Sequence, residues 1–97
     1  MTISALDEYS IRFCLRLAVC GKPHLAAIEI AEAEGVSIDY ARKVLNLMAR
    51  MGILDPVRGQ KGGYRLSSPP QSITLADILR AVHPEKGELC NYCEKFK

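Results

Sequence analysis

A glycine turn between two helix-like stretches restricts what this chain can fold into more than any other feature. Residues 25–34 have the spacing of a short helix, and Gly35 supplies the left-handed conformation that ends such a helix. Ser37 is a good N-cap for a second helix, which we expect to run to about residue 51. Two helices joined by a short turn with a glycine predict a helix-turn-helix.

The second of these helices is strongly amphipathic. Its inward face is predicted to hold Ala41, Val44, Leu45 and Met48. Its outward face would carry Asp39, Arg42, Lys43, Asn46 and Arg50. In the shorter helix we expect Ile28 and Ala31 to face inward and the glutamates to face outward. Tyr40 has two open interpretations: its ring packs under the following hairpin, or its hydroxyl reaches DNA.

After Gly52 the pattern changes from helical to extended. Residues 53–58 predict a strand, which Pro56 confines to the edge of a sheet, and residues 64–66 predict the returning strand. The turn between them, residues 59–63, is rich in glycine and carries Lys61. A basic hairpin directly after a helix-turn-helix is typical of a wing, so we predict a mostly α fold with a small β-hairpin, a winged helix-turn-helix.

Two further helices complete the predicted domain. Thr74 and Asp77 form a capping box for a helix that Ile78, Leu79 and Val82 line and that ends at His83. At the other end, residues 4–20 predict a helix that is apolar on two sides. Because a domain of this size has little interior, we expect one of those sides to contact a second copy of the chain in a homodimer.

The distribution of charge points to nucleic acid. The chain of 97 residues carries a net charge of only +2, but residues 42–65 hold six of its thirteen Lys and Arg residues and a single acidic residue. Residues 1–38 hold three basic and five acidic residues. Taken singly, each cation on the outward helix face is more often solvated than bound. As a cluster on a helix and the hairpin after it, the cations favour contact with DNA phosphates.

Composition excludes several other classes. With 48% apolar and 25% charged residues, the chain is typical of a folded single domain. There is no apolar run long enough to span a membrane and no secretory pattern at the N-terminus, so we expect a cytoplasmic protein. No nucleophile elbow, phosphate-binding loop or metalloprotease helix occurs, which predicts that the chain is not an enzyme.

Two of the four cysteines, Cys90 and Cys93, have the spacing of a metal-binding pair. They make half of a four-thiolate zinc or iron–sulfur site, and a reduced dithiol or a redox-active disulfide fits the same spacing equally well. His83 is a weaker candidate for a further ligand. Cys14 and Cys20 do not share a helix face and are expected to be small buried hydrophobes, and His24 is expected at the surface.

The helix-turn-helix and the hairpin together resemble the Rrf-type winged-helix transcription regulators. The matching segments are residues 9–12, residues 30–37 with Tyr40 and residues 44–45, residues 52–54 and 57–66, and residues 69–82, and the hairpin segment is highly specific. The resemblance implies a homodimeric DNA-binding regulator. It assigns DNA contacts to Ser37, Asp39, Tyr40 and Arg42 on the helix and to Arg58, Gly59 and Lys61 on the wing. Because cluster-assembly regulators usually carry Glu where this chain has Arg42, the resemblance implies a different operator preference.

The resemblance also divides the chain in two: a winged helix-turn-helix DNA-binding domain at 1–83 and a cysteine-containing segment at 84–97. Family members usually continue through a long helix that contacts the partner subunit, and cluster-binding members offer three cysteines there. Residues 84–97 are therefore interpreted as a truncated sensor and dimerisation region with Cys90 and Cys93 as metal ligands.

The sequence thus predicts a sequence-specific regulator that binds a double-stranded DNA operator, a homodimeric repressor or dual regulator that responds to an iron–sulfur, redox or nitric oxide signal. The predicted DNA-binding residues are Ser37, Asp39, Tyr40, Arg42, Lys43, Asn46, Arg50, Arg58, Gly59, Lys61 and Arg65. The alternatives are a cluster-free regulator that senses through thiols or a partner protein, a small metal-binding redox protein that does not bind DNA, and a winged helix that docks on another protein.

Overall fold

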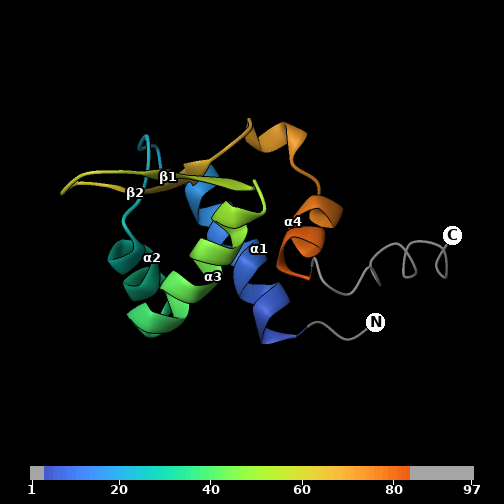
Figure 1. The fold of residues 1–97 in the computed structure, drawn as a ribbon, viewed down its shortest axis with the longest axis horizontal. Helices are drawn as coiled ribbons and strands as arrows, with labels where there is room; N and C mark the ends of the chain where they lie inside the picture. The colour runs from blue at the N-terminus through green and yellow to red at the C-terminus, as the bar shows by residue number, and fades with distance from the viewer. Residues whose placement is uncertain (1–3, 84–97) are drawn as a thin grey trace, which may run out of the picture.

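The computed structural model describes residues 4–83, and these form the predicted mostly α domain with one hairpin (Figure 1). The elements follow in the order α1 (Ala5–Val19), α2 (Ala27–Glu34), α3 (Ile38–Arg50), β1 (Leu54–Val57), β2 (Gly63–Leu66), the 3-10 turn η1 (Pro70–Ser72) and α4 (Leu75–Val82). The helices α2 and α3 are the predicted helix-turn-helix, and β1 and β2 are the predicted wing. The fold class is confirmed.

Local capping contacts determine where the helices begin and end. Gly35 ends α2 with φ of 69°, in the left-handed region that side chains with a Cβ rarely adopt. The predicted box at α4 is present: the Thr74 hydroxyl accepts the Asp77 N–H at 3.1 Å, and the Asp77 carboxylate accepts the Thr74 N–H at 3.0 Å. Ser4 and Asp7 make the same pair of contacts at the start of α1.

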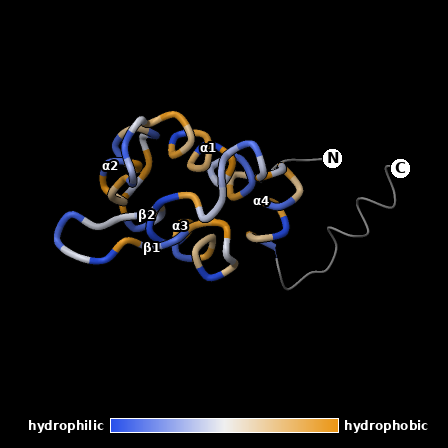
Figure 2. Tube along the Cα trace, turned by 90° about the horizontal axis from the view of Figure 1, so that it is seen from above, coloured by the Kyte–Doolittle hydropathy of each residue, from blue (hydrophilic) through white to orange (hydrophobic). Residues whose placement is uncertain are grey.

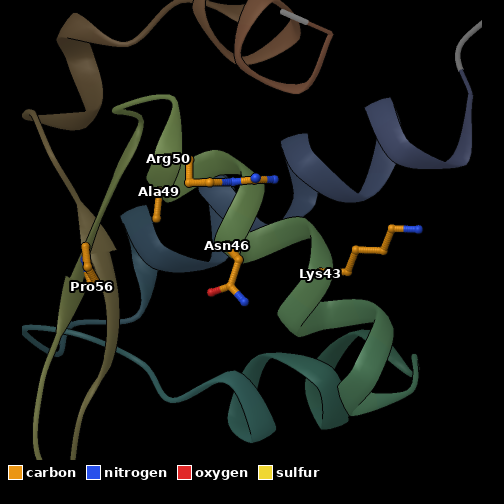
Figure 3. A pocket seen from close by; sticks show the side chains of 5 residues that line it. All are labelled: Lys43, Asn46, Ala49, Arg50 and Pro56. Carbon is orange, nitrogen blue, oxygen red and sulfur yellow. The ribbon is translucent and has the colours of Figure 1, made fainter.

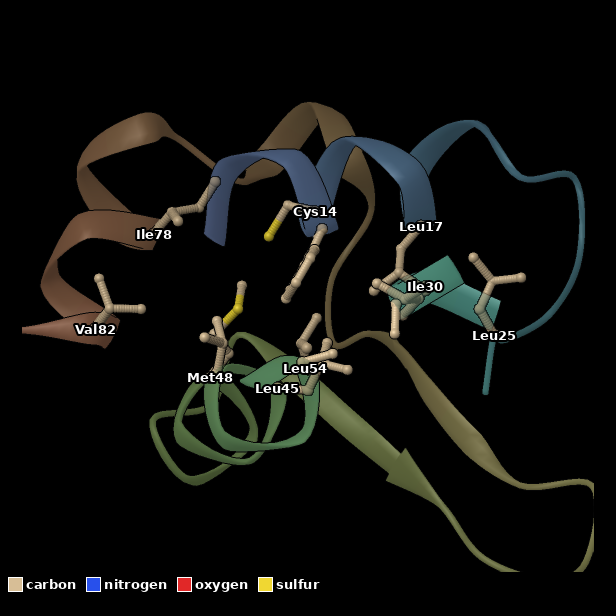
Figure 4. Close-up of a cluster of buried hydrophobic side chains, with 13 residues drawn as sticks. Cys14, Leu17, Leu25, Ile30, Leu45, Met48, Leu54, Ile78 and Val82 are labelled. Carbon is tan, nitrogen blue, oxygen red and sulfur yellow. The ribbon is translucent and has the colours of Figure 1, made fainter. Parts of the chain in front are cut away.

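The hydrophobic core lies between α1 and α3, with α4 at one end and α2 at the other (Figure 4). The four α3 residues predicted to face inward, Ala41, Val44, Leu45 and Met48, are all buried. Phe13 of α1, Ile30 of α2 and Leu54 of β1 complete the centre of this core. The core therefore fixes α3 against the rest of the domain through its whole length and leaves its other face to solvent.

Two predictions for α2 were wrong. Ile28 is 51% exposed, and Ile30 is buried in its place. The side chain of Glu34, expected to face outward, is only 5% exposed and pairs with Arg16 at 2.6 Å. The inward face of α2 holds positions 27, 30, 31 and 34, and the packing of the helix against α1 and α3 decides this orientation.

The chain before α2 is extended because Leu25 pairs with Tyr64 of β2 in an antiparallel bridge. The N–H of Leu25 donates to the Tyr64 carbonyl at 3.0 Å, and the N–H of Tyr64 donates back at 2.8 Å. The approach is close: a Cβ on Gly63 would lie 2.1 Å from the Leu25 carbonyl oxygen, so only glycine fits there. This third stretch of the sheet was not predicted, and it holds β2 on the side opposite β1.

The helix α1 is apolar on two sides, as the sequence indicates. Phe13, Cys14 and Leu17 face the core, whereas Leu15 and Val19 are 59% and 78% exposed. These two large apolar side chains lie mostly exposed on one face of α1, and the homodimer contact expected there stays a prediction.

Candidate nucleic-acid interface

The start of α3 is built as the sequence predicts. The hydroxyl of Ser37 accepts the N–H of Tyr40 at 3.1 Å, which caps the helix. Asp39 lies in the first turn, where the helix dipole favours a carboxylate. Both residues are exposed, and their contact with DNA stays a prediction.

The outward face of α3 is exposed along its whole length, in agreement with its predicted composition. Positions 39, 42, 46 and 50 follow one another at the spacing of neighbouring helix turns, with Lys43 beside them. Beyond this face lies the hairpin, and between them is a hollow of about 660 Å³ (Figure 3). It is lined by Lys43, Asn46, Ala49, Arg50 and Pro56.

The wing extends beyond the helices, and its hydrophilic tip stands out in Figure 2. Arg58, Gly59 and Lys61 are exposed there. The tip is held from below: the ring Nε2 of His24 lies 2.5 Å from the Lys61 carbonyl oxygen and donates its N–H to it. His24, expected only at the surface, is half-buried and positions the wing. No local pattern could have indicated this contact, which joins residues 37 positions apart.

Charge pairing separates the two sides of the domain. Of the ten Lys and Arg side chains within residues 4–83, five lie within 4 Å of a carboxylate oxygen: Arg12, Arg16, Lys22, Arg65 and Arg80. The other five make no such pair with any described residue, and all five belong to α3 or the wing: Arg42, Lys43, Arg50, Arg58 and Lys61. The unpaired positive charge is therefore confined to one surface.

Arg65 differs from the other predicted contacts. It lies opposite Asp55 in the register of the hairpin, and its Nε is 3.7 Å from the Asp55 carboxylate. Pro56 and Tyr64 project from the hairpin toward α3, and because side chains alternate along a strand, Arg65 and Asp55 project from the other face. The structure thus separates Arg65 from the outward face of α3.

Two tyrosines have contacts that the sequence did not predict. The ring of Tyr40 packs against Tyr9 of α1 at a centroid distance of 5.7 Å, edge to face, and not under the wing. Burial raises the pKa of its phenol. Tyr64, which had no predicted role, occupies the position under the wing, and its hydroxyl donates a hydrogen bond to the side-chain oxygen of Asn46. This contact ties the wing to α3.

The candidate metal ligands Cys90 and Cys93 lie outside the described residues. Among residues 4–83 there is no group of three or more His, Cys, Asp or Glu side chains that could hold a metal ion. Burial raises the pKa of the Cys14 thiol to about 12, which disfavours the thiolate that a metal requires. The Cys20 thiol is half-buried and donates to the Leu17 carbonyl.

His83, the weaker ligand candidate, makes a different contact in this domain. Its Nε2 lies 2.5 Å from the carboxylate of Asp7, so it joins the end of α4 to the start of α1. Burial opposes ionisation of Asp7, but the hydrogen bonds from His83 and Ser4 outweigh it, and the pKa of Asp7 is lowered.

The winged helix-turn-helix and its unpaired cations on α3 and the wing are the features expected of a DNA-binding regulator. A family model described as Rrf2, iron-dependent transcriptional regulator, matches residues 3–96. The chain belongs to the Rrf2 family of transcriptional regulators. This membership confirms the resemblance stated above, and it agrees with the prediction that the chain is not an enzyme.

Solved structures of Rrf2 regulators share the fold. The chain is 29% identical to CymR of B. subtilis, described as its global cysteine regulator, over 84% of this chain and 64% of that one, with a TM-score of 0.79. It is 29% identical to IscR of T. potens over 84% of this chain and 61% of that one, with a TM-score of 0.77. The oxidized form of CymR of Staphylococcus aureus is 31% identical, over 89% and 70% of the two chains, with a TM-score of 0.77.

The Rrf2 chain described here spans less than two thirds of the length of the first two of these proteins. None of the helices between residues 4 and 83 combines the length and the apolar character that crossing a membrane requires.

Proposed function

We propose that this Rrf2 regulator binds double-stranded operator DNA in a sequence-specific manner, with α3 in the major groove and the wing against the adjacent phosphates. The observation that carries the proposal is the confinement of the five unpaired cations to α3 and the wing. Cations that have no carboxylate partner among residues 4–83 can neutralise DNA phosphates. An α-helix matches the width of the major groove.

The contacts divide by their place on this surface. Arg58 and Lys61 at the tip, with the Gly59 backbone beside them, suit phosphates, which fix register without reading sequence. Arg42 and Asn46, in the middle of the outward face, suit base edges. Around these two we place the remaining contacts of α3, which are Ser37, Asp39, Tyr40, Lys43 and Arg50. Arg65 belongs to the proposed interface only through its pair with Asp55, which shapes the hairpin.

The active form is proposed to be a homodimer. Leu15 and Val19 leave an apolar strip on α1, which a second copy of the chain would cover. A two-fold axis would then place two recognition helices in successive major grooves, so the operator would carry two similar half-sites about one helical turn apart.

The signal is proposed to enter at Cys90 and Cys93, as an iron–sulfur, redox or nitric oxide response that reaches the DNA-binding unit through α4. The support is their two-residue spacing, with the description of the family model and the IscR neighbour. A cluster would need ligands beyond this pair, and none is grouped for it within residues 4–83. A cluster-free regulator that senses through thiols or a partner protein is the second candidate, favoured by the similarity to CymR, described as a cysteine regulator.

Two measurements on the purified chain test the sensor proposal. An anaerobic absorption spectrum with iron and sulfide analysis should show a visible band with matching iron and sulfide if a cluster is present, whereas a colourless, iron-free protein favours thiol or partner sensing. The Cys90→Ala variant should then lose the effector dependence of operator affinity. Unchanged effector dependence in that variant would exclude the segment as the sensor.

Salt dependence tests DNA binding itself. Duplexes selected by the full chain from a randomised pool would be titrated by fluorescence anisotropy over a series of salt concentrations. The logarithm of affinity should fall linearly with the logarithm of salt, with a slope of about −0.9 for each phosphate contact. A chain that selects no duplex, or binds without salt dependence, would point to the redox or protein-docking alternative instead.

A further inference from the structure

One side chain on the outward face of α3 is held in a fixed orientation by the wing. The Tyr64 hydroxyl donates to the side-chain oxygen of Asn46, although 18 residues separate the two in the chain. In Figure 3 the amide oxygen of Asn46 lies on the side of the hairpin and the amide nitrogen points away from it. Asn46 is exposed, so its nitrogen faces solvent on the surface that would meet DNA.

The backbone of Tyr64, the donor in this contact, is held in place by Leu25. Both backbone groups of Tyr64 bond to Leu25, and the glycine before it leaves no room for the strand to shift toward Leu25. Burial raises the pKa of the Tyr64 phenol, against the opposing charge of the nearby Arg42. The phenol therefore keeps its proton at neutral pH, and because its partner is the Asn46 oxygen, which can only accept, the hydroxyl is the donor of this bond.

We propose that Tyr64 makes Asn46 a reader of hydrogen-bond acceptors, so that Asn46 selects guanine or thymine and not adenine at its base pair. The proposal rests on the DNA-binding function proposed above. Tyr64 is the positioning residue and Asn46 is the specificity-determining residue.

The chemistry of the base edges gives the reason. An asparagine recognises adenine by two bonds at once: its N–H₂ donates to N7 and its oxygen accepts from N6. Because Tyr64 holds the Asn46 oxygen toward the hairpin, the edge that Asn46 turns away from the hairpin carries its N–H₂ donors alone. In the major groove, guanine presents the acceptors N7 and O6, and thymine presents O4. Adenine would leave its N6 donor without a partner, and an unpaired donor in an interface costs free energy.

The experiment compares operator preferences among variants of the full chain. Each chain would select duplexes from a randomised pool, and the affinity for the selected duplex and its single base-pair variants would be measured by fluorescence anisotropy. The variants are Asn46→Ala, Asn46→Asp and Tyr64→Phe, with Tyr9→Phe as the matched control because Tyr9 lies on α1 and no hydrogen bond of its hydroxyl is seen within residues 4–83.

We expect Asn46→Ala to lose base preference at one base pair of each half-site. At that base pair the unsubstituted chain should prefer guanine or thymine over adenine by roughly fivefold or more. Tyr64→Phe frees the oxygen and should shift the preference toward adenine, and Tyr9→Phe should leave it unchanged. Asn46→Asp replaces the donor by an acceptor and should shift the preference toward cytosine. Because Asn46 is exposed, this variant tests the proposal even if Tyr64→Phe does not fold.

Three results would overturn the inference while leaving DNA binding intact. They are a preference of the unsubstituted chain for adenine at the Asn46-dependent base pair, an Asn46→Ala variant that loses affinity equally for all duplexes, and unchanged preferences in Tyr64→Phe and Asn46→Asp. If the unsubstituted chain binds no duplex in a salt-dependent manner, the proposed function itself fails.

Discussion

The α1–α2 side of the domain and the α3–wing side treat positive charge in opposite ways. On the first side, Glu34 is almost fully enclosed, with Arg16 at 2.6 Å and Arg12 at 3.5 Å. On the second side, five cations stand without a carboxylate partner among residues 4–83. The first arrangement joins two helices. The second arrangement does not stabilise the folded state, because like charges on one surface repel each other.

The difference shows how stability and function are separated in a small domain. The helices on both sides follow the same rules of capping and amphipathic spacing, so local structure does not distinguish them. What distinguishes them is whether each cation finds a carboxylate in the folded chain. A surface that is left unpaired at a cost to stability is where a ligand of opposite charge is expected to bind.

The sharpest test of this contrast removes two of the unpaired cations and, as a control, two paired cations that lie outside α3 and the wing. Arg58→Ala with Lys61→Ala should weaken binding to all duplexes by about a hundredfold at low salt and lower the salt slope by about two, since two phosphate contacts are lost. The matched control, Lys22→Ala with Arg80→Ala, removes paired cations and should change neither. Equal losses in both double variants, measured by anisotropy at several salt concentrations, would contradict the division into two sides.

A second test asks whether the unpaired surface also discriminates. Arg42→Ala should change the ranking of duplex variants by roughly fivefold or more at its base pair, because Arg42 lies in the middle of the outward face of α3. Competition binding with a panel of single base-pair variants provides the measurement, and Arg80→Ala is the control. A variant whose affinity falls but whose ranking is unaltered would exclude Arg42 from base reading.

On the paired side, Glu34→Gln should lower the free energy of unfolding by about 1–2 kcal/mol, since charge-assisted bonds from two arginines are weakened. Urea unfolding should show a lower midpoint at unchanged slope. Glu32→Gln, an exposed position of the same helix, should leave the midpoint in place. If both variants unfold alike, the Glu34 contacts contribute nothing to joining α1 and α2.

The smallest expected effect is a pH dependence at the far end of α1. Because its partners hold the pKa of Asp7 below its ordinary value, ionised Asp7 stabilises the fold at higher pH. That contribution is lost as the pH falls through the lowered pKa. Asp7→Asn should therefore flatten the loss of stability in acid, as measured by urea unfolding from pH 6 to pH 3. An identical pH profile for the variant and the unsubstituted chain would show that the contact with His83 adds no stability.

Much of the fold follows from local pattern. The caps at Ser37 and Thr74, the turn at Gly35 and the two faces of α3 each depend on residues at most four or five positions apart. The structure confirms all of them. The start of α2 was misplaced because Leu25 has a helical spacing with the residues after it but is held extended by Tyr64, 39 positions later in the chain.

The short range of sequence patterns also explains why contacts in the candidate site were not predicted. Sequence pattern places Arg42, Asn46 and Lys61 in a basic segment, but it does not tell paired cations from unpaired ones. The pairs that decide the surface, such as Arg16 with Glu34 and Tyr64 with Asn46, join residues 18 positions apart. Such contacts depend on how the helices pack and not on helical or strand periodicity.

By itself, the sequence determined the winged helix-turn-helix, the composition of the outward face of α3 and the basic tip of the wing, because periodicity, capping and turn residues act over a few positions. Only the tertiary structure decided which cations are neutralised and which way Asn46 presents its amide. Those properties come from side chains of different elements that packing brings together, and the free energy of each contact depends on that packing.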